Sequence, residues 1–289
     1  RAQALADYST ALGNQSTAKA NFALAVGYDS VASGEQSTAV GFKAKSTAFA
    51  SNAIGGSSLA EGEFSTAVGQ ESYTDKKATQ ALAVGYRSNA FGEQSTAVGF
   101  QSRSEGYASN AIGSSSSAKG RFSTAIGGSS VAEGDFSIAI GQEAKTVAGQ
   151  NFATALGFQS NASGYASFAQ GFTAEASGAG SIAIGDKSKA TNNDTIAIGT
   201  KAEATGFRAI SIGKSNNVSG YKSAAIGNDN KFTTDNTFVV GRNVTKTLEN
   251  SVFLGAEAAY TTKGASTDGD AAVTEPVTVG GTLTYGGFA

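Results

Sequence analysis

The 289-residue chain contains no His, Cys, Met or Trp, and it has a single Pro. Without His and Cys it lacks an imidazole base, a thiolate nucleophile, the usual zinc ligands and any disulfide. These absences remove the side chains on which most enzyme and metal sites depend. We therefore expect no catalytic residues, no metal and no cofactor, and we do not expect an enzyme.

Charged residues and long apolar runs are also scarce. Charged side chains make up 15% of the chain and the net charge is −2, which disfavours a nucleic-acid partner. The apolar runs are only a few residues long, far below the ~18 residues of a membrane span, so we expect no direct membrane contact. Because the chain begins with Arg1 and shows no signal peptide, we interpret it as a processed or trimmed piece.

Glycine and alanine are abundant instead, with 38 and 52 copies, and they follow a repeat. A motif of the form Ser/Thr-x-Ala-apolar-Gly recurs, and we call its final residue the anchor glycine. Fifteen of the intervals between anchors are 14 residues long and two are 16. The anchors are Gly13, Gly27, Gly41, Gly55, Gly69, Gly85, Gly99, Gly113, Gly127, Gly141, Gly157, Gly171, Gly185, Gly199, Gly213, Gly227, Gly241 and Gly255. Residues from about 10 to 255 therefore form one array.

Each repeat divides into two half-repeats of seven residues. A second glycine, such as Gly34, Gly62 or Gly106, lies half a period before many anchors. Within each half the residues alternate with a period of two, which indicates strands, and glycine supplies the positive φ of tight corners. Two strands and two corners fit into 14 residues, so the pattern predicts a flattened, two-layer, parallel solenoid.

The two predicted strands differ in their chemistry. In the first strand the residue two before the anchor is Ala in 15 of 18 repeats, and the residue one before is apolar in 17 of 18. Alternation places small residues on one face and Val, Ile and Thr on the other, while the second strand carries charges such as Lys45 and Arg103. We expect the small residues to fill the space between the sheets. The converse assignment, with apolar residues inside and Ala outside, stays open.

If the small residues point inward, the apolar face of the first strand has no partner within one chain. A continuous apolar stripe of that length exceeds what soluble monomers expose. We infer an obligate homo-oligomer whose apolar strands line a common axis. The predicted interface residues are Val40, Ile54, Val68, Val98, Ile112, Ile126, Ile140, Ile184, Ile198 and Ile212.

The array resembles the head domain of trimeric autotransporter adhesins, the YadA-like left-handed parallel β-roll. The resemblance rests on segments such as STAVG ending at Gly41 and SNAIG ending at Gly55, repeated with a period of 14. It implies an all-β homotrimer, exported to a bacterial cell surface and anchored in the outer membrane through C-terminal regions absent here. It implies adhesion to host matrix proteins, cells or abiotic surfaces. We predict a head of about 18 coils over residues 1–255 and a truncated neck or connector over 256–289.

The two 16-residue intervals hold the insertions, which we expect to project from a corner. Tyr73, Lys76 and Lys77 lie in the first, and Lys145, Thr146 and Gln150 in the second. They are candidate ligand contacts, with tolerated loop insertion as the alternative.

Aromatic residues supply a second set of candidates. Several follow an anchor, and neighbours one coil apart should stack in pairs, either as packing at a corner or as an exposed patch. These residues are Tyr28, Phe42, Tyr86, Phe100, Phe158 and Phe172. A further set falls on the otherwise charged face of the second strand and is the better candidate for ligand contact: Tyr107, Tyr165, Phe207 and Tyr221.

Three other functions compete with adhesion. A purely structural spacer is favoured by the duplicated blocks, such as EQSTAVGF at residues 35–42 and 93–100. An ice-binding solenoid needs an exposed Thr ladder, whereas Thr38, Thr66 and Thr96 recur beside the apolar stripe. Left-handed β-helix acyltransferases have an 18-residue coil and a His base, neither of which is present.

Overall fold

The computed structural model describes residues 1–260 and divides into two compact units, Arg1–Leu156 and Gly157–Ala289. All regular elements in the described residues are β-strands, which confirms the predicted all-β class. Residues 1–260 contain no helix long and apolar enough to cross a membrane. Most of the predicted connector lies outside the described residues.

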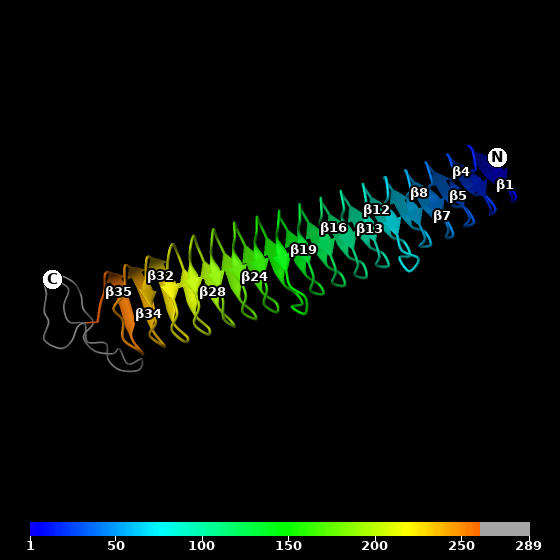
Figure 1. Ribbon diagram of the computed structural model, residues 1–289. Helices are drawn as coiled ribbons and strands as arrows, with labels where there is room; N and C mark the ends of the chain where they lie inside the picture. Colours follow the sequence, from blue (N-terminus) through cyan, green and yellow to red (C-terminus); the bar gives the residue numbers. More distant parts are fainter. Residues whose placement is uncertain (261–289) are drawn as a thin grey trace. The chain divides into compact units, whose positions relative to one another are not determined.

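In the first unit, short two-residue strands alternate along the chain with longer three-residue strands (Figure 1). The short strands are β1 (Gln3–Ala4), β3 (Thr17–Ala18), β5 (Val31–Ala32), β7 (Lys45–Ser46), β9 (Leu59–Ala60), β11 (Tyr73–Thr74), β13 (Asn89–Ala90), β15 (Arg103–Ser104), β17 (Ser117–Ala118), β19 (Val131–Ala132) and β21 (Lys145–Thr146). The long strands are β2 (Thr10–Leu12), β4 (Leu24–Val26), β6 (Thr38–Val40), β8 (Asn52–Ile54), β10 (Thr66–Val68), β12 (Leu82–Val84), β14 (Thr96–Val98), β16 (Asn110–Ile112), β18 (Thr124–Ile126), β20 (Ile138–Ile140) and β22 (Thr154–Leu156).

The second unit repeats this alternation. Its short strands are β23 (Asn161–Ala162), β25 (Glu175–Ala176), β27 (Lys189–Ala190), β29 (Glu203–Ala204), β31 (Asn217–Val218) and β33 (Lys231–Phe232). Its long strands are β24 (Phe168–Gln170), β26 (Ile182–Ile184), β28 (Ile196–Ile198), β30 (Ile210–Ile212), β32 (Ala224–Asn228), β34 (Phe238–Arg242) and β35 (Val252–Ala256). In each unit, therefore, we distinguish a short-strand sheet and a long-strand sheet.

Strands within each sheet pair in parallel and in register from one coil to the next. Strand β6 pairs with β8 so that Ala39 lies opposite Ala53 and Val40 lies opposite Ile54. Short strands pair in the same way, with Ala32 of β5 opposite Ser46 of β7. Equivalent positions of successive repeats consequently form straight rows along each sheet. The parallel solenoid with two strands per coil is confirmed, while its handedness stays a prediction.

The space between the two sheets is filled by small side chains. The Ala residues two before the anchors, such as Ala39, Ala97 and Ala183, are fully buried, and so are the short-strand residues Ala32 and Ala90. Buried serines accompany them, and many donate a hydrogen bond to the carbonyl that opens their own turn, as in Ser58 Oγ to Gly55 O at 2.9 Å. The predicted inward face is confirmed, and the converse assignment is wrong.

The two kinds of corner use glycine for different reasons. At an anchor corner, the turn after a long strand, Gly41 has φ +137° and a Cβ there would lie 2.5 Å from the Gly55 carbonyl oxygen. At a half-repeat corner, the turn that leads into a long strand, Gly106 has no positive φ, but a Cβ would lie 2.0 Å from the Gly120 oxygen. The positive φ expected of that glycine falls two residues later, on residues such as Gln36 (φ 58°) and Phe64 (φ 56°). Close approach between coils is therefore the reason for half-repeat glycines.

Larger residues enter the core near the end of the second unit. Val218, Phe232, Val239 and Phe253 are buried at positions that hold Ala, Ser or Thr in earlier coils. Strands β32, β34 and β35 also lengthen to five residues. The roll therefore accommodates bulkier residues in its last described coils.

Candidate functional site

The outer face of the long-strand sheet presents two rows of side chains. We call the residues one before the anchors the near row and those three before the anchors the far row. All ten predicted interface residues belong to the near row and lie outside the roll. Ile54, Ile112 and Ile140 are exposed, whereas the remainder are half-buried: Val40, Val68, Val98, Ile126, Ile184, Ile198 and Ile212. Each unit thus leaves an apolar row uncovered, as the sequence predicts.

The far row differs between the units. In the first unit it is mostly polar, with Thr38, Asn52, Thr66, Thr96 and Asn110 among its members. In the second unit it consists entirely of apolar residues, namely Phe168, Ile182, Ile196, Ile210, Ala224, Phe238 and Val252. The second unit therefore has two adjacent apolar rows on this face, and the first unit has one.

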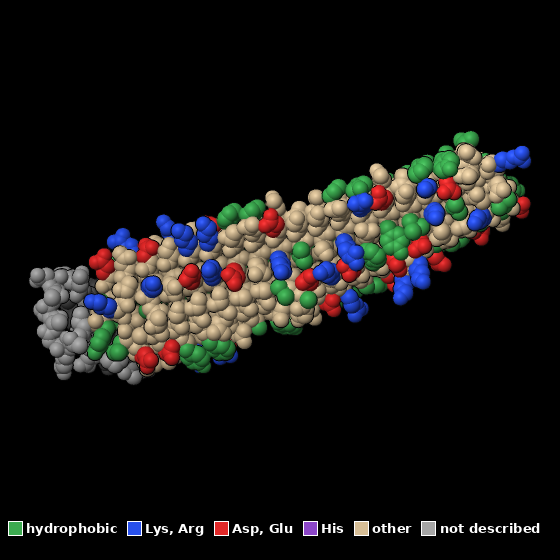
Figure 2. Space-filling view, viewed as in Figure 1, with side chains coloured by type: hydrophobic (Ala, Val, Ile, Leu, Met, Phe, Trp, Pro, Cys, Tyr) green, Lys and Arg blue, Asp and Glu red, His purple; other side chains and the backbone are tan. Residues whose placement is uncertain are grey.

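The short-strand sheet faces outward with charged and polar residues, as the face seen in Figure 2 shows. Lys119 Nζ and Glu133 Oε1 lie 2.6 Å apart, and the Lys119 hydrogen bond lowers the pKa of Glu133. At the anchor corners, Arg87 and Glu71 form a second pair, in which the hydrogen bond to Glu71 raises the pKa of Arg87. Ion pairs this exposed add little stability and mainly keep the surface solvated.

Tyr73 occupies this face within a fixed polar and aromatic cluster. Its hydroxyl lies 3.0 Å from both Glu61 Oε2 and Asp75 Oδ2, and its ring meets Phe91 edge to face at 5.6 Å. Arg103 lies 4.4 Å from the centre of the Phe91 ring. Burial, followed by these hydrogen bonds to carboxylates, raises the pKa of Tyr73, so the phenol remains a donor. The cluster presents a pre-positioned ring and charges on this face.

Both insertions form longer loops at the half-repeat corners of the first unit (Figure 1, cyan and green). Lys76 and Lys77 are exposed in the first loop, where the Lys77 N–H donates to Asp75 Oδ1 at 2.9 Å. Ala78 is fully buried and fixes the base of that loop. In the second insertion, Lys145 and Thr146 form β21, and Gln150 lies in the turn that follows. The expected projection from a corner is confirmed for the two loops, but it is wrong for Thr146, which is fully buried in β21 and donates to Ser137 Oγ.

The structure places the second aromatic set at corners. Tyr107, Tyr165, Phe207 and Tyr221 were expected on the face of the short strands, but each lies in the turn after a half-repeat glycine. That glycine begins the turn, so the residue after it leaves the strand direction. Tyr165 and Tyr221 are exposed, and Phe207 stacks on Tyr221 with ring centres 5.7 Å apart. These residues remain accessible for contact from a corner.

The aromatic pairs predicted at the anchor corners are confirmed. Ring centres lie 5.5 Å apart for Tyr28 and Phe42, and 5.4 Å apart for Tyr86 and Phe100. In the second unit, Phe158 and Phe172 stack at 5.1 Å.

Sequence reasoning missed a longer aromatic series at the half-repeat corners. Phe122, Phe136 and Phe152 are 42%, 49% and 52% exposed and stack at 5.0 and 5.3 Å, and Tyr107 meets Phe122 at 5.2 Å. The available signal was the recurrence of Phe at a 14-residue interval, at 122 and 136. Their turn position with positive φ could not be inferred from an alternating pattern.

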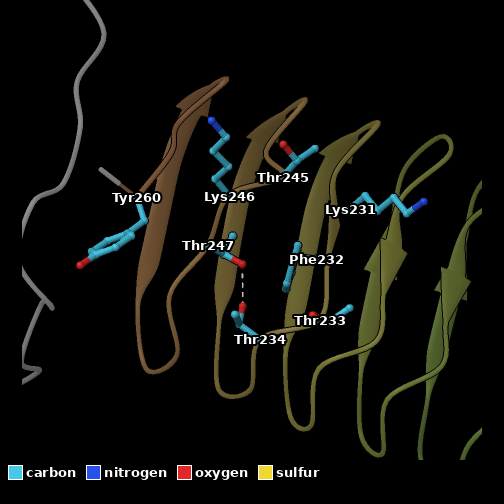
Figure 3. Close-up of a pocket in the computed structure, with 8 residues that line it drawn as sticks. All are labelled: Lys231, Phe232, Thr233, Thr234, Thr245, Lys246, Thr247 and Tyr260. Carbon is cyan, nitrogen blue, oxygen red and sulfur yellow. Dashed lines mark hydrogen bonds between the residues drawn. The ribbon is translucent and has the colours of Figure 1, made fainter. Parts of the chain in front are cut away.

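A hollow of about 630 Å³ lies in the second unit beside its last described coils (Figure 3). It is lined by Lys231, Phe232, Thr233, Thr234, Thr245, Lys246, Thr247 and Tyr260. Thr234 and Thr247 join their hydroxyls at 2.6 Å within it. This lining holds two ammonium groups and several hydroxyls but includes no carboxylate or imidazole that would act as a base.

Together, these features define a class of protein: a parallel β-solenoid of 14-residue coils with a charged face, an apolar face and corner loops. The chain belongs to the family described as YadA head domain repeat (2 copies). The match covers residues 4–30, 18–44, 32–53, 46–72, 77–102, 104–130, 118–144, 149–174, 176–202 and 204–230.

The crystal structure of the collagen-binding domain of Yersinia adhesin YadA is similar at 23% sequence identity and a TM-score of 0.35. The similarity covers 53% of this chain and 68% of that chain. At these values it adds nothing to the family assignment. The curated proteins gave no match.

Proposed function

We propose that this chain is the head of a bacterial surface adhesin that works as a homotrimer. Family membership supports the adhesin role, and the uncovered apolar row of the long-strand sheet supports self-association. Three copies pack these faces around a common axis and leave the short-strand faces and loops for ligand. The head is carried at the cell surface by an outer-membrane anchor beyond the present sequence, through a connector that begins at residues 256–289.

The observation that best supports the trimer is that the near-row side chains point outward from the roll. Residues such as Ile54 and Ile140 are exposed in one copy although their row is almost wholly apolar. Covering them removes apolar area from water, worth roughly 25 cal/mol per Å². Sedimentation equilibrium on the full 289-residue chain should therefore give a mass of three chains. A single-chain mass at micromolar concentration would contradict the trimer.

The proposed ligands are matrix or host-surface proteins, or abiotic surfaces. We propose contacts through the loop residues Lys76 and Lys77, the Tyr73 cluster, and the second-unit corner residues Tyr165, Phe207 and Tyr221. The candidate with the sharpest test is the loop, because its two lysines are exposed and form no ion pair with the described residues.

Collagen is the first probe, since the similar Yersinia domain is a collagen-binding domain. A solid-phase assay should compare the parent trimer with K76A/K77A on collagen, fibronectin and polystyrene. The matched control is Lys45→Ala, which removes an exposed lysine from the short-strand face away from the loop. Loss of binding in the loop variant alone supports these contacts. If the parent bound no surface that whole cells bind, a purely structural spacer would replace the adhesin.

A further inference from the structure

The two corners of each coil carry aromatic residues in a coordinated way along the first unit. We number its first ten coils by their anchors, from Gly13 in coil 1 to Gly141 in coil 10. The half-repeat corners hold aromatics in coils 1, 2, 4, 5, 8, 9 and 10, namely Tyr8, Phe22, Phe49, Phe64, Tyr107, Phe122 and Phe136. The anchor corners hold them in coils 2, 3, 6 and 7, namely Tyr28, Phe42, Tyr86 and Phe100. Each of these ten coils has an aromatic corner, and only coil 2 has two. The coordination ends there, because the coil with anchor Gly157 has both Phe152 and Phe158.

Contacts within one chain do not explain this coordination. The two corners of a coil lie at opposite edges of the flattened roll, so their side chains are separated by the strands (Figure 1). Aromatics at each corner stack only on neighbours along the same edge, as Phe122 does on Phe136. Most of these rings remain exposed, for example Phe22, Phe42 and Phe64. Within one chain, therefore, a side chain at one edge does not contact the side chain at the other edge, and its size cannot directly influence which residue is found there.

Two glycines at anchor corners add an independent observation. Gly56 and Gly128 have no positive φ, and a Cβ at either would meet no atom nearer than 3.9 Å. Aromatic residues such as Tyr28 occupy the same corner position elsewhere, so the single chain has room for a large side chain there. Glycine costs conformational entropy where the backbone does not require it. Both glycines lie in coils whose half-repeat corner is aromatic, with Phe49 in coil 4 and Phe122 in coil 9.

We propose that, between adjacent copies of this chain and along these ten coils, the half-repeat corner of one copy packs against the anchor corner of the next at the same height. Phe49 and Phe122 then fill the space left by the neighbour's Gly56 and Gly128, and the alternation fixes the axial register of the copies. Contact between two different edges is heterologous, and such contacts close into a ring around a symmetry axis. We call this corner-to-corner contact the seam. It rests on the self-association of the proposed function, and it specifies the axial register in which the copies associate. A foreign ligand that touched one edge would not account for the coordination with the other.

Chemical cross-linking tests the register because the chain has no cysteine of its own. In the full chain, the double variant F122C/G128C places both thiols in coil 9, and a short bis-maleimide should join neighbouring copies into covalent trimers. The control Q94C/G128C moves one thiol to the half-repeat corner of coil 7, about 10 Å along the axis at the strand spacing. It should give at least tenfold less covalent trimer. Single-cysteine variants should give none.

The outcomes separate this inference from the proposed function. A trimeric mass with no cross-linking of the matched pair, or with equal cross-linking of the offset pair, overturns the register. A single-chain mass before cross-linking overturns the self-association itself.

A second variant tests the space rather than the distance. Gly128→Phe should leave the secondary structure of each chain intact, by circular dichroism, because its Cβ has room. It should weaken trimer association at least tenfold, since the neighbour's Phe122 fills that space. Adding Phe122→Gly exchanges large for small at every seam and should restore association. Unchanged association in G128F overturns the proposal. A Phe122→Gln variant gives a further test: if it loses surface binding while its trimer association stays at the parental level, Phe122 contacts a ligand and the proposal is also overturned.

Discussion

The two units of this protein share one scaffold but differ on the face that we propose for self-association. Both fill the interior with Ala and Ser, and both carry an apolar near row. The far row separates them, because Thr96 and Asn110 of the first unit correspond to residues such as Ile196 and Ile210 in the second. Both kinds of residue fit equally well into an in-register strand. The outer face is therefore free to vary while the coil stays constant.

This difference indicates a division of roles along the array. Two adjacent apolar rows remove more area from water on association than one, so the second unit should supply most of the association free energy. The polar far row of the first unit has hydroxyl and amide groups that remain hydrated or bond locally, as Asn52 does with Thr66 at 3.5 Å. In that unit, we therefore expect the specificity of self-association to come from the corners rather than from the apolar area that is buried.

The largest expected effect comes from charge on the far row. Ile196→Asp puts a carboxylate between Ile182 and Ile210 in the register of the sheet, and the trimer would bury it without a partner. An uncompensated buried charge costs roughly 3–5 kcal/mol, so association should weaken more than 100-fold. Thr96→Asp, flanked by Leu82 and Asn110, is the matched change in the first unit and should weaken it less than tenfold. Sedimentation equilibrium over a dilution series measures both.

Equal losses in these two variants would mean that the far rows are equally buried, and the division of roles would be wrong. Near-row charge at Ile198 and Val98 should be costly in both units, since that row is apolar in each.

A second comparison removes an anchor glycine from each unit. A Cβ at Gly41 would lie 2.5 Å from the Gly55 oxygen, and one at Gly199 would lie 2.3 Å from the Gly213 oxygen. Both residues also have positive φ, so Gly41→Ala and Gly199→Ala should each lower the free energy of unfolding by more than about 2 kcal/mol. Urea unfolding followed by circular dichroism measures this. Thr38→Ala is the control and should cost less than about 0.5 kcal/mol, because Ala224 holds the same row position.

Similar losses in the two units would support the common scaffold. A loss confined to one unit would show that the close approach between coils is not equally important in both.

The third comparison uses a polar ladder in the core of the second unit. Buried Asn230 donates to Asn216 Oδ1 at 3.0 Å and to the Gly241 oxygen at 2.9 Å, and accepts from the Val244 N–H at 3.0 Å. At the corresponding position of the first unit, the Ser130 hydroxyl donates to the Gly127 oxygen of its own turn at 3.0 Å. Asn230→Ser leaves buried groups unpaired and should cost about 1–3 kcal/mol. Hydrogen exchange at the Val244 amide should accelerate accordingly, whereas Ser130→Ala should cost about 1 kcal/mol. Unchanged exchange at Val244 would argue against the ladder.

Much of this architecture follows from the sequence because a strict repeat multiplies each weak signal. Ala39 alone says little, but Ala at the same place in 15 repeats predicts the inward face, and the structure confirms it. The corners were harder to predict. Tyr107 and Phe122 lie in turns where positive φ falls on residues other than glycine, so alternation misplaced the first and overlooked the second. The candidate contacts at Lys76 and Lys77 followed from the interval length alone, which reveals an insertion but not its ligand.

The smallest expected effect concerns the charged face and its dependence on pH. Hydrogen bonding to Lys119 lowers the pKa of Glu133, so this pair adds stability above the usual range of a glutamate pKa and loses it as pH falls through the lowered value. Lys119 is 47% and Glu133 22% exposed, so screening limits the contribution to about 0.5 kcal/mol. Lys119→Ala should therefore reduce the free energy of unfolding at pH 7 and leave it unchanged at pH 2.

The second unit offers a control. Glu203 accepts a hydrogen bond from Asn217 at 2.7 Å. Lys189 lies opposite Glu203 in register, with no ion pair between them in the described structure. Lys189→Ala should accordingly show a smaller difference between pH 7 and pH 2. An equal difference in both variants would mean that general screening by the face, rather than the Lys119–Glu133 contact, sets the dependence.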